Sequence, residues 1–233
     1  WADEVREYNK KKKVVFTYSR AEKTMELGTA VRLSNGNTMI TESGSNPIIV
    51  EVNKKGEVVK SVPLKPDTDN IHMQTRMARK LTNGNYLAPH LLAFAVKEYQ
   101  PDGNVVNVFR TDLADLGGRE AENWPFTAIR LDNGNTLVTL THGNKVVEFD
   151  ANGKVVWEIN NSHVKESPFV DPCGAQRLPN GNTVIASYGA QKGIKLFEVS
   201  PDKSLVWSYD GHRVHHFQIL TTNGKPLKGT PLK

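Results

Sequence analysis

Cysteine is almost absent from this sequence, which has one such residue, Cys173, among 233. A single thiol excludes a disulfide framework within the chain and any cysteine-based zinc finger. Long apolar runs are lacking too, and no stretch reaches the roughly 18 residues that a membrane-spanning helix needs. Neither sign of charge dominates, since 30 basic and 25 acidic residues leave a net charge of +5. We therefore expect a globular chain with no membrane span and no nucleic-acid partner.

Helical periodicity is also missing, and a repeat takes its place. The tripeptide Asn-Gly-Asn occurs at 35–37, 83–85, 133–135 and 180–182, and a fifth Asn-Gly follows at 223–224. The Asn-to-Asn spacings of 48, 50, 47 and 43 residues indicate a repeated unit of that length. Short apolar alternations on both sides of each Asn-Gly predict β-hairpins, and the Asn-Gly pair favours the type I′ turn.

A second repeated hairpin precedes each Asn-Gly hairpin. It begins at Glu7, Glu51, Glu98, Glu148 and Glu198, and the five segments align without a gap. Each unit therefore has four short strands, and repeated four-stranded units of this length are the blades of a β-propeller.

The chain starts with the second hairpin of a unit and ends with the first hairpin of another. We predict one domain over residues 1–233, a five-bladed propeller closed by pairing residues 4–18 with residues 214–227. The alternative is a larger ring with a further blade upstream of Trp1.

The pattern LxNGNTLV followed by VVEFDANGKVVW resembles the PQQ-like, or quinoprotein-type, propeller repeats of bacterial extracytoplasmic proteins. The resemblance covers the whole chain and implies a periplasmic or secreted location. PQQ itself is not expected, because Cys173 stands alone where the quinone enzymes carry an adjacent pair of cysteines.

Function is expected on the face that carries the long, irregular connections, because irregular loops on a rigid frame commonly hold binding sites. All seven histidines fall on that face of the predicted blades. We predict one polar pocket at the mouth of the central channel. Its ligand-binding residues are His72, Arg76, His90, Trp124, Thr127, His142, Gln176, Tyr188 and His216.

Residues that recur in every blade are assigned to the scaffold, because the chemistry should come from positions that differ between blades. The recurring glutamates named above belong here, as do the basic residues before the Asn-Gly turns, Arg32, Lys80, Arg130 and Arg177. Cys173 is expected to be a buried, inert thiol. Trp124 could pack in the core or stack on a sugar.

Three functions compete. The first is a binding propeller for a small polar or anionic ligand, a glycan or a protein partner. The second is an arylsulfotransferase-like enzyme with a channel histidine as nucleophile, because HMQTRMARKLTNGNYL resembles one blade of that family. The third is a metalloenzyme with an ion held by imidazoles from several blades. No catalytic residue is assigned.

Overall fold

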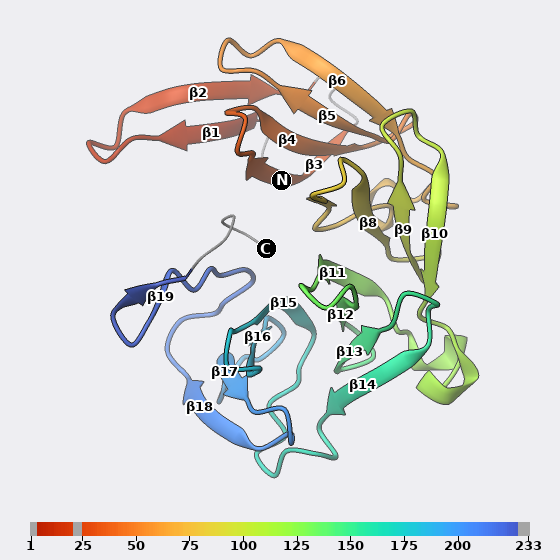
Figure 1. The fold of residues 1–233 in the computed structure, drawn as a ribbon, viewed down its shortest axis with the longest axis vertical. Coiled ribbons are helices and arrows are strands. Elements are labelled where there is room, and N and C mark those ends of the chain that lie inside the picture. The colour runs from red at the N-terminus through yellow and green to blue at the C-terminus, as the bar shows by residue number, and fades with distance from the viewer. Residues whose placement is uncertain (1–3, 21–24, 228–233) are drawn as a thin grey trace. The chain divides into compact units, whose positions relative to one another are not determined.

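The computed structural model describes residues 4–20 and 25–227, which form twenty β-strands and three short 3-10 helices (Figure 1). These residues divide into two compact units. The first unit runs up to Ala93 and includes Lys97–Asn107, and the second unit comprises Phe94–Val96 and the chain from Val108 onward.

Four four-stranded antiparallel sheets match the predicted blades. The first contains β3 (Glu26–Arg32), β4 (Thr38–Ser43), β5 (Ile48–Val52) and β6 (Val58–Pro63). The second contains β7 (Arg79–Lys80), β8 (Tyr86–His90), β9 (Ala95–Tyr99) and β10 (Val105–Arg110). The third contains β11 (Pro125–Arg130), β12 (Thr136–Leu140), β13 (Lys145–Phe149) and β14 (Val155–Asn160). The fourth contains β15 (Pro172–Arg177), β16 (Thr183–Ser187), β17 (Leu196–Val199) and β18 (Leu205–Tyr209).

The half-blades expected near the two ends of the chain are present as hairpins. Strands β1 (Glu4–Tyr8) and β2 (Val14–Ser19) pair, and β19 (Thr221–Thr222) pairs with β20 (Lys225–Pro226). Each pair is a separate two-stranded sheet in the described part of the chain. Their union into a fifth blade stays a prediction.

The predicted type I′ turn is wrong at four of the five Asn-Gly sites. Gly36 has a φ of +87°, whereas Asn35 is not among the residues with positive φ. The Gly36 N–H donates to Leu33 O at 3.0 Å, and the Leu33 N–H donates to Asn37 O at 2.8 Å. This is a type I turn followed by a left-handed glycine, the three-residue hairpin loop with a G1 bulge. The same bonds recur at Gly84, Gly134 and Gly181.

The fifth Asn-Gly makes the predicted turn. Asn223 and Gly224 both have positive φ, at +51° and +73°. Thr222 pairs with Lys225, so the loop holds two residues, as a type I′ turn requires.

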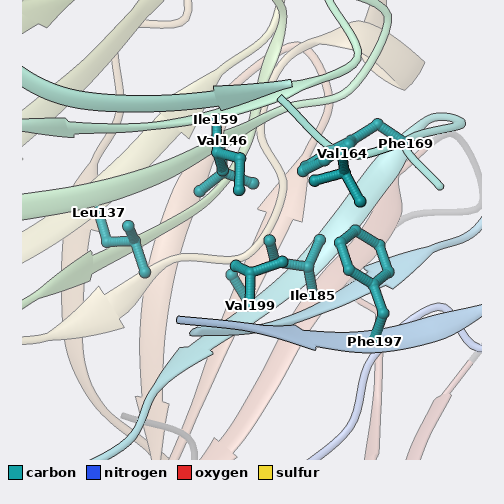
Figure 2. Packing of buried hydrophobic residues seen from close by; sticks show 9 residues of the cluster. Leu137, Val146, Ile159, Val164, Phe169, Ile185, Phe197 and Val199 are labelled. Atoms are coloured by element: carbon teal, nitrogen blue, oxygen red, sulfur yellow. The ribbon is translucent and has the colours of Figure 1, made fainter. Parts of the chain in front are cut away.

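Burial falls from the second strand to the last strand of each blade. Every residue of β4, β8 and β12 is buried, whereas four of the six residues of β6 are exposed. In the second unit, nine buried residues form an apolar cluster, and Figure 2 shows Phe169 and Phe197 beside Ile185 within it. The two phenylalanine rings meet edge to face at 5.0 Å. The blades therefore carry the predicted site residues on strands, as for His90, Thr127 and Gln176, and on the connections between strands.

The 3-10 helices lie in connections that the sequence predicts to be irregular. They are η1 (Ile71–Met73), η2 (Ala114–Leu116) and η3 (Arg119–Ala121). None of the described helices is long and apolar enough to span a membrane.

Candidate functional site

The nine predicted site residues divide between the two units. His72, Arg76 and His90 belong to the first unit, and the other six belong to the second unit. A single pocket formed by all nine stays a prediction. We therefore describe the residues of each unit by themselves.

His90 ends β8 and is completely buried, with 0% of its surface exposed. Its Nδ1 lies 3.1 Å from Gln74 O and 2.9 Å from Thr75 Oγ1, and its Nε2 lies 2.7 Å from the Tyr99 hydroxyl. Because a carbonyl oxygen only accepts, Nδ1 carries the hydrogen and Nε2 accepts the Tyr99 proton. Burial lowers the pKa of His90 to about 3. The imidazole is therefore neutral at physiological pH and is fixed by hydrogen bonds.

The hydrogen-bond network continues from Tyr99 to the surface. The Lys65 N–H donates to the Tyr99 hydroxyl at 3.0 Å, and Lys65 O accepts from Lys97 Nζ at 2.6 Å. Lys97 is 8% exposed and also pairs with the Asp67 carboxylate at 2.7 Å. Asp67 lines an open pocket of about 370 Å³ in the first unit. The other lining residues are Gly44, Ser45, Pro47, Leu64, Pro66, Thr68, Asp69 and Gln74, none of them a predicted ligand residue.

His72 and Arg76 lie close together in the first unit. The exposed His72 ring places Nδ1 3.1 Å from Glu26 Oε2. The Arg76 guanidinium donates to His72 O and to Thr75 O. In these contacts Arg76 orders the backbone that leads into β7.

The most elaborate group of predicted residues surrounds His142 in the second unit. The His142 ring stacks on Trp124 with 4.2 Å between centroids and 19° between planes. Its Nδ1 lies 3.1 Å from Glu122 Oε2, and its Nε2 lies 3.9 Å from Asp171 Oδ1. The His142 side chain is 45% exposed. An accessible imidazole is thus placed against an indole and has a carboxylate near each nitrogen.

The backbone around this group is strained. Glu122, Asn144 and Asp171 have φ values of +47°, +51° and +45°, a region that side chains other than glycine rarely occupy. Asn144 Oδ1 accepts the Asp171 N–H at 2.8 Å, which ties the two strained loops together. Such conformations cost about 1–3 kcal/mol each and cluster at functional sites.

Sequence reasoning missed Glu122 and Asp171, although the repeat contains a signal for one of them. The offset of 47 residues between Asn133 and Asn180 also relates Trp124-Pro125 to Asp171-Pro172. Asp171 therefore occupies in the fourth sheet the position that Trp124 occupies in the third. No comparable signal marks Glu122, because the residue at the same offset in the fourth repeat is Phe169, which carries no carboxylate.

Tyr188 and His216 meet in a second aromatic group of the second unit. The Tyr188 ring lies edge to face with His215 at 4.4 Å, and Arg213 covers it at 3.9 Å. His216 Nε2 lies 3.4 Å from Thr127 Oγ1.

Gln176 holds the backbone after these histidines. Its Oε1 accepts the Ile219 N–H at 2.9 Å, and its Nε2 donates to Ile219 O at 3.4 Å. Gln176 therefore binds the chain's own backbone in this structure.

The scaffold residues behave as predicted where the structure shows their partners. Within single units, Glu51 pairs with Lys80, and Glu148 pairs with Arg177 at 2.8 Å. Cys173 is a buried free thiol with 2% of its surface exposed. Across residues 4–20 and 25–227, no three or more His, Cys, Asp or Glu side chains are grouped to hold a metal ion.

A family model described as Mal s 1 allergenic protein-like matches residues 8–166, more than half of the chain. No curated protein matches the sequence. The PQQ-like repeat family expected from the sequence is not the family that this model describes.

Solved structures resemble the chain at low identity. A Bacteroides caccae protein of unknown function is 23% identical, with a TM-score of 0.77 over 90% of this chain and 75% of its own. A catalytically inactive virginiamycin B lyase from Staphylococcus aureus, solved with quinupristin, is 13% identical, with a TM-score of 0.65 over 89% of this chain. A streptogramin B lyase is 12% identical, with a TM-score of 0.64 over 92% of this chain.

These matches confirm the predicted fold class, an all-β propeller of four-stranded antiparallel blades. The chain spans 63% and 64% of the length of the two lyases, so it covers less than two thirds of each.

Proposed function

This chain belongs to the family of Mal s 1 allergenic protein-like proteins, and we propose that it is a ligand-binding β-propeller. The proposed site is the group formed by Trp124, His142, Glu122 and Asp171. The proposed ligand is a neutral glycan.

One observation carries the proposal. Glu122 and Asp171 are held in left-handed backbone conformations that place their carboxylates at opposite nitrogens of one exposed imidazole. Exposed ion pairs contribute only about 0–1 kcal/mol, so these two pairs do not offset the backbone strain. Strain of this kind is retained where a defined arrangement of side chains is useful, as in a binding site.

The chemistry of the group favours hydroxyl-bearing ligands over anions. Glu122 and Asp171 place two negative charges beside one imidazole, which disfavours a phosphate, sulfate or carboxylate. Carboxylates accept hydrogen bonds from hydroxyl groups, and a partly exposed indole offers an apolar face to a sugar ring. Trp124 supplies that face, and its stacking on His142 fixes its orientation.

The test is a screen on immobilised neutral glycans, followed by calorimetry with the best one. We expect Trp124→Leu and His142→Gln each to weaken binding about tenfold, the effect of losing about 1.4 kcal/mol of contact. Trp207→Leu is the matched control, because Trp207 is 47% exposed on β18 and lies outside the group. Unchanged binding in both site variants would contradict the proposal.

A second candidate is acid–base catalysis by His142. An accessible imidazole oriented by a carboxylate is the arrangement of a general base, and Glu122 contacts Nδ1 in this way. Virginiamycin B lyase has a similar fold and was solved with quinupristin, so quinupristin is a compound to test as a substrate. Liquid chromatography with fragment-ion mass spectrometry after incubation with quinupristin would reveal turnover, including ring opening without a change of mass, and its loss in His142→Gln would assign the base.

The sulfuryl-transfer and metal alternatives have less support from the described geometry. His90 is buried with both nitrogens hydrogen-bonded, and two carboxylates beside His142 would repel an anionic sulfate ester. A periplasmic or secreted location rests on the repeat resemblance, and fractionation of the source cells would test it.

A further inference from the structure

Arg79 is a charged residue at a buried position where other repeats carry an aliphatic residue. The offsets between Asn-Gly turns align it with Val31, Ile129 and Gln176 of the other sheets. Val31 and Ile129 are buried aliphatic residues, 7% and 4% exposed, and Arg79 is also only 7% exposed. It pairs across β7 and β8 with Leu87, which is fully buried. One blade therefore buries a cation where others bury an aliphatic side chain.

The guanidinium of Arg79 has few hydrogen-bond partners within residues 4–20 and 25–227. Its Nη1 donates to Ala78 O at 2.9 Å, and its Nε is buried without a hydrogen-bond partner. No carboxylate of the described residues pairs with it. The next residue, Lys80, differs in this respect, because it pairs with the buried Glu51. Arg79 is thus a buried cation that has no paired carboxylate among the described residues and whose Nε has no hydrogen-bond partner.

Burial alone lowers the pKa of Arg79, to about 10, so the side chain remains charged at neutral pH. A buried charge without a counter-charge is strongly unfavourable, and proteins normally pair or neutralise it. An anion from solution would supply the missing counter-charge.

We propose that Arg79 binds a small oxyanion in the first unit, a site separate from the Trp124–His142 group. The Nε–H and Nη2–H groups of a guanidinium form a planar fork that matches two oxygens of a carboxylate or a tetrahedral oxyanion. The 7% exposure of Arg79 favours a small ion or the anionic group of a slender ligand. The site differs from the proposed glycan site in charge and in unit, so either proposal can fail without the other.

The repeat itself supplies the test variants. Arg79→Gln and Arg79→Ile introduce the residues that the fourth and third sheets carry at this position, Gln176 and Ile129. Lys192→Gln is the matched control, because it removes one positive charge from an exposed loop. Circular dichroism verifies that each variant is folded.

Thermal unfolding and calorimetry are then measured at pH 7 with sodium formate and with sodium sulfate, using chloride to keep the ionic strength constant. An ion bound once per chain, at about ten times its Kd, raises the unfolding midpoint by about 3–6 °C. We expect this rise in the wild type and in Lys192→Gln, and its absence in both Arg79 variants. The general stabilising effect of sulfate cancels in that comparison.

The two salts distinguish the ligand geometry. A response to formate alone indicates a planar carboxylate, a response to sulfate alone indicates a tetrahedral oxyanion, and a response to both indicates either. Equal midpoint shifts in the wild type and the Arg79 variants, with no calorimetric binding, would overturn the proposal.

Discussion

Nε2 of His90 lies 2.7 Å from the hydroxyl oxygen of Tyr99, and this contact is enclosed in the first unit. The opposite nitrogen contacts Gln74 and Thr75, which lie between η1 and β7. The neutral imidazole therefore connects β8, β9 and the connection that enters the sheet. A histidine placed in this way makes folding sensitive to acid.

The first prediction concerns that sensitivity. Burial lowers the pKa of His90 to about 3 in the folded chain, whereas an unfolded histidine titrates near 6.5. Between these values the unfolded chain binds the extra proton, so the contribution is complete above about pH 6.5 and is lost as the pH falls. Urea unfolding of the wild type should lose about 2 kcal/mol more between pH 7 and pH 5 than unfolding of His90→Gln. Parallel pH profiles for the two proteins would refute this role.

The second prediction compares two ion pairs at equivalent repeat positions. The Glu148 side chain is 7% exposed and accepts from Arg177 at 2.8 Å and from Asn135 at 2.7 Å. The Glu7 side chain is 47% exposed and pairs with Arg32. Glu148→Gln should lower the free energy of unfolding by about 3 kcal/mol, whereas Glu7→Gln should lower it by less than about 1 kcal/mol. Urea denaturation of both variants checks the difference, and equal losses would show that burial does not set the strength of this recurring pair.

The third prediction concerns the loop beneath the His142 group. A Cβ on Gly143 would lie 2.0 Å from Oδ1 of Asn123, which is fully buried. Asn123 precedes Trp124, so a shift there should disturb the stack on His142. Gly143→Ala is expected to lower the free energy of unfolding by about 1–3 kcal/mol and to weaken glycan binding.

A double-mutant cycle tests whether that clash is the cause. Asn123→Ala removes the obstructing oxygen, so the two changes together should cost less than the sum of the single changes. If the losses of unfolding free energy in the two single variants simply add in the double variant, the clash with Asn123 is not the cause of the loss in Gly143→Ala.

Much of the fold could be predicted because the repeat specifies it several times over. Five aligned hairpins fixed the four-stranded unit, since alternation and turn residues agreed in each. The turn type was not fixed in this way. Asn-Gly fits both a two-residue type I′ loop and a three-residue loop with a G1 bulge, and the strand register decides between them. Thr222 pairs with Lys225, whereas Leu33 bonds with Asn37.

The candidate site could be predicted only in part. Trp124 and His142 were found because they stand where blades differ. Glu122 was not found, because its position depends on a left-handed backbone conformation that the sequence pattern does not reveal. The buried state of His90 was not foreseen either, because a strand-end histidine can face the pocket or the sheet and tertiary packing decides.

The central claim is that Trp124 and His142 form the glycan site, and nitrogen-15 NMR of the tryptophan indoles tests it most directly. The chain has four tryptophans, and Trp124→Phe identifies the signal of Trp124. Titration with the best-binding glycan should shift the Trp124 signal, with the other indole signals unchanged. A glycan that binds while leaving the Trp124 signal in place, or that shifts only the signal of another tryptophan, would contradict the account.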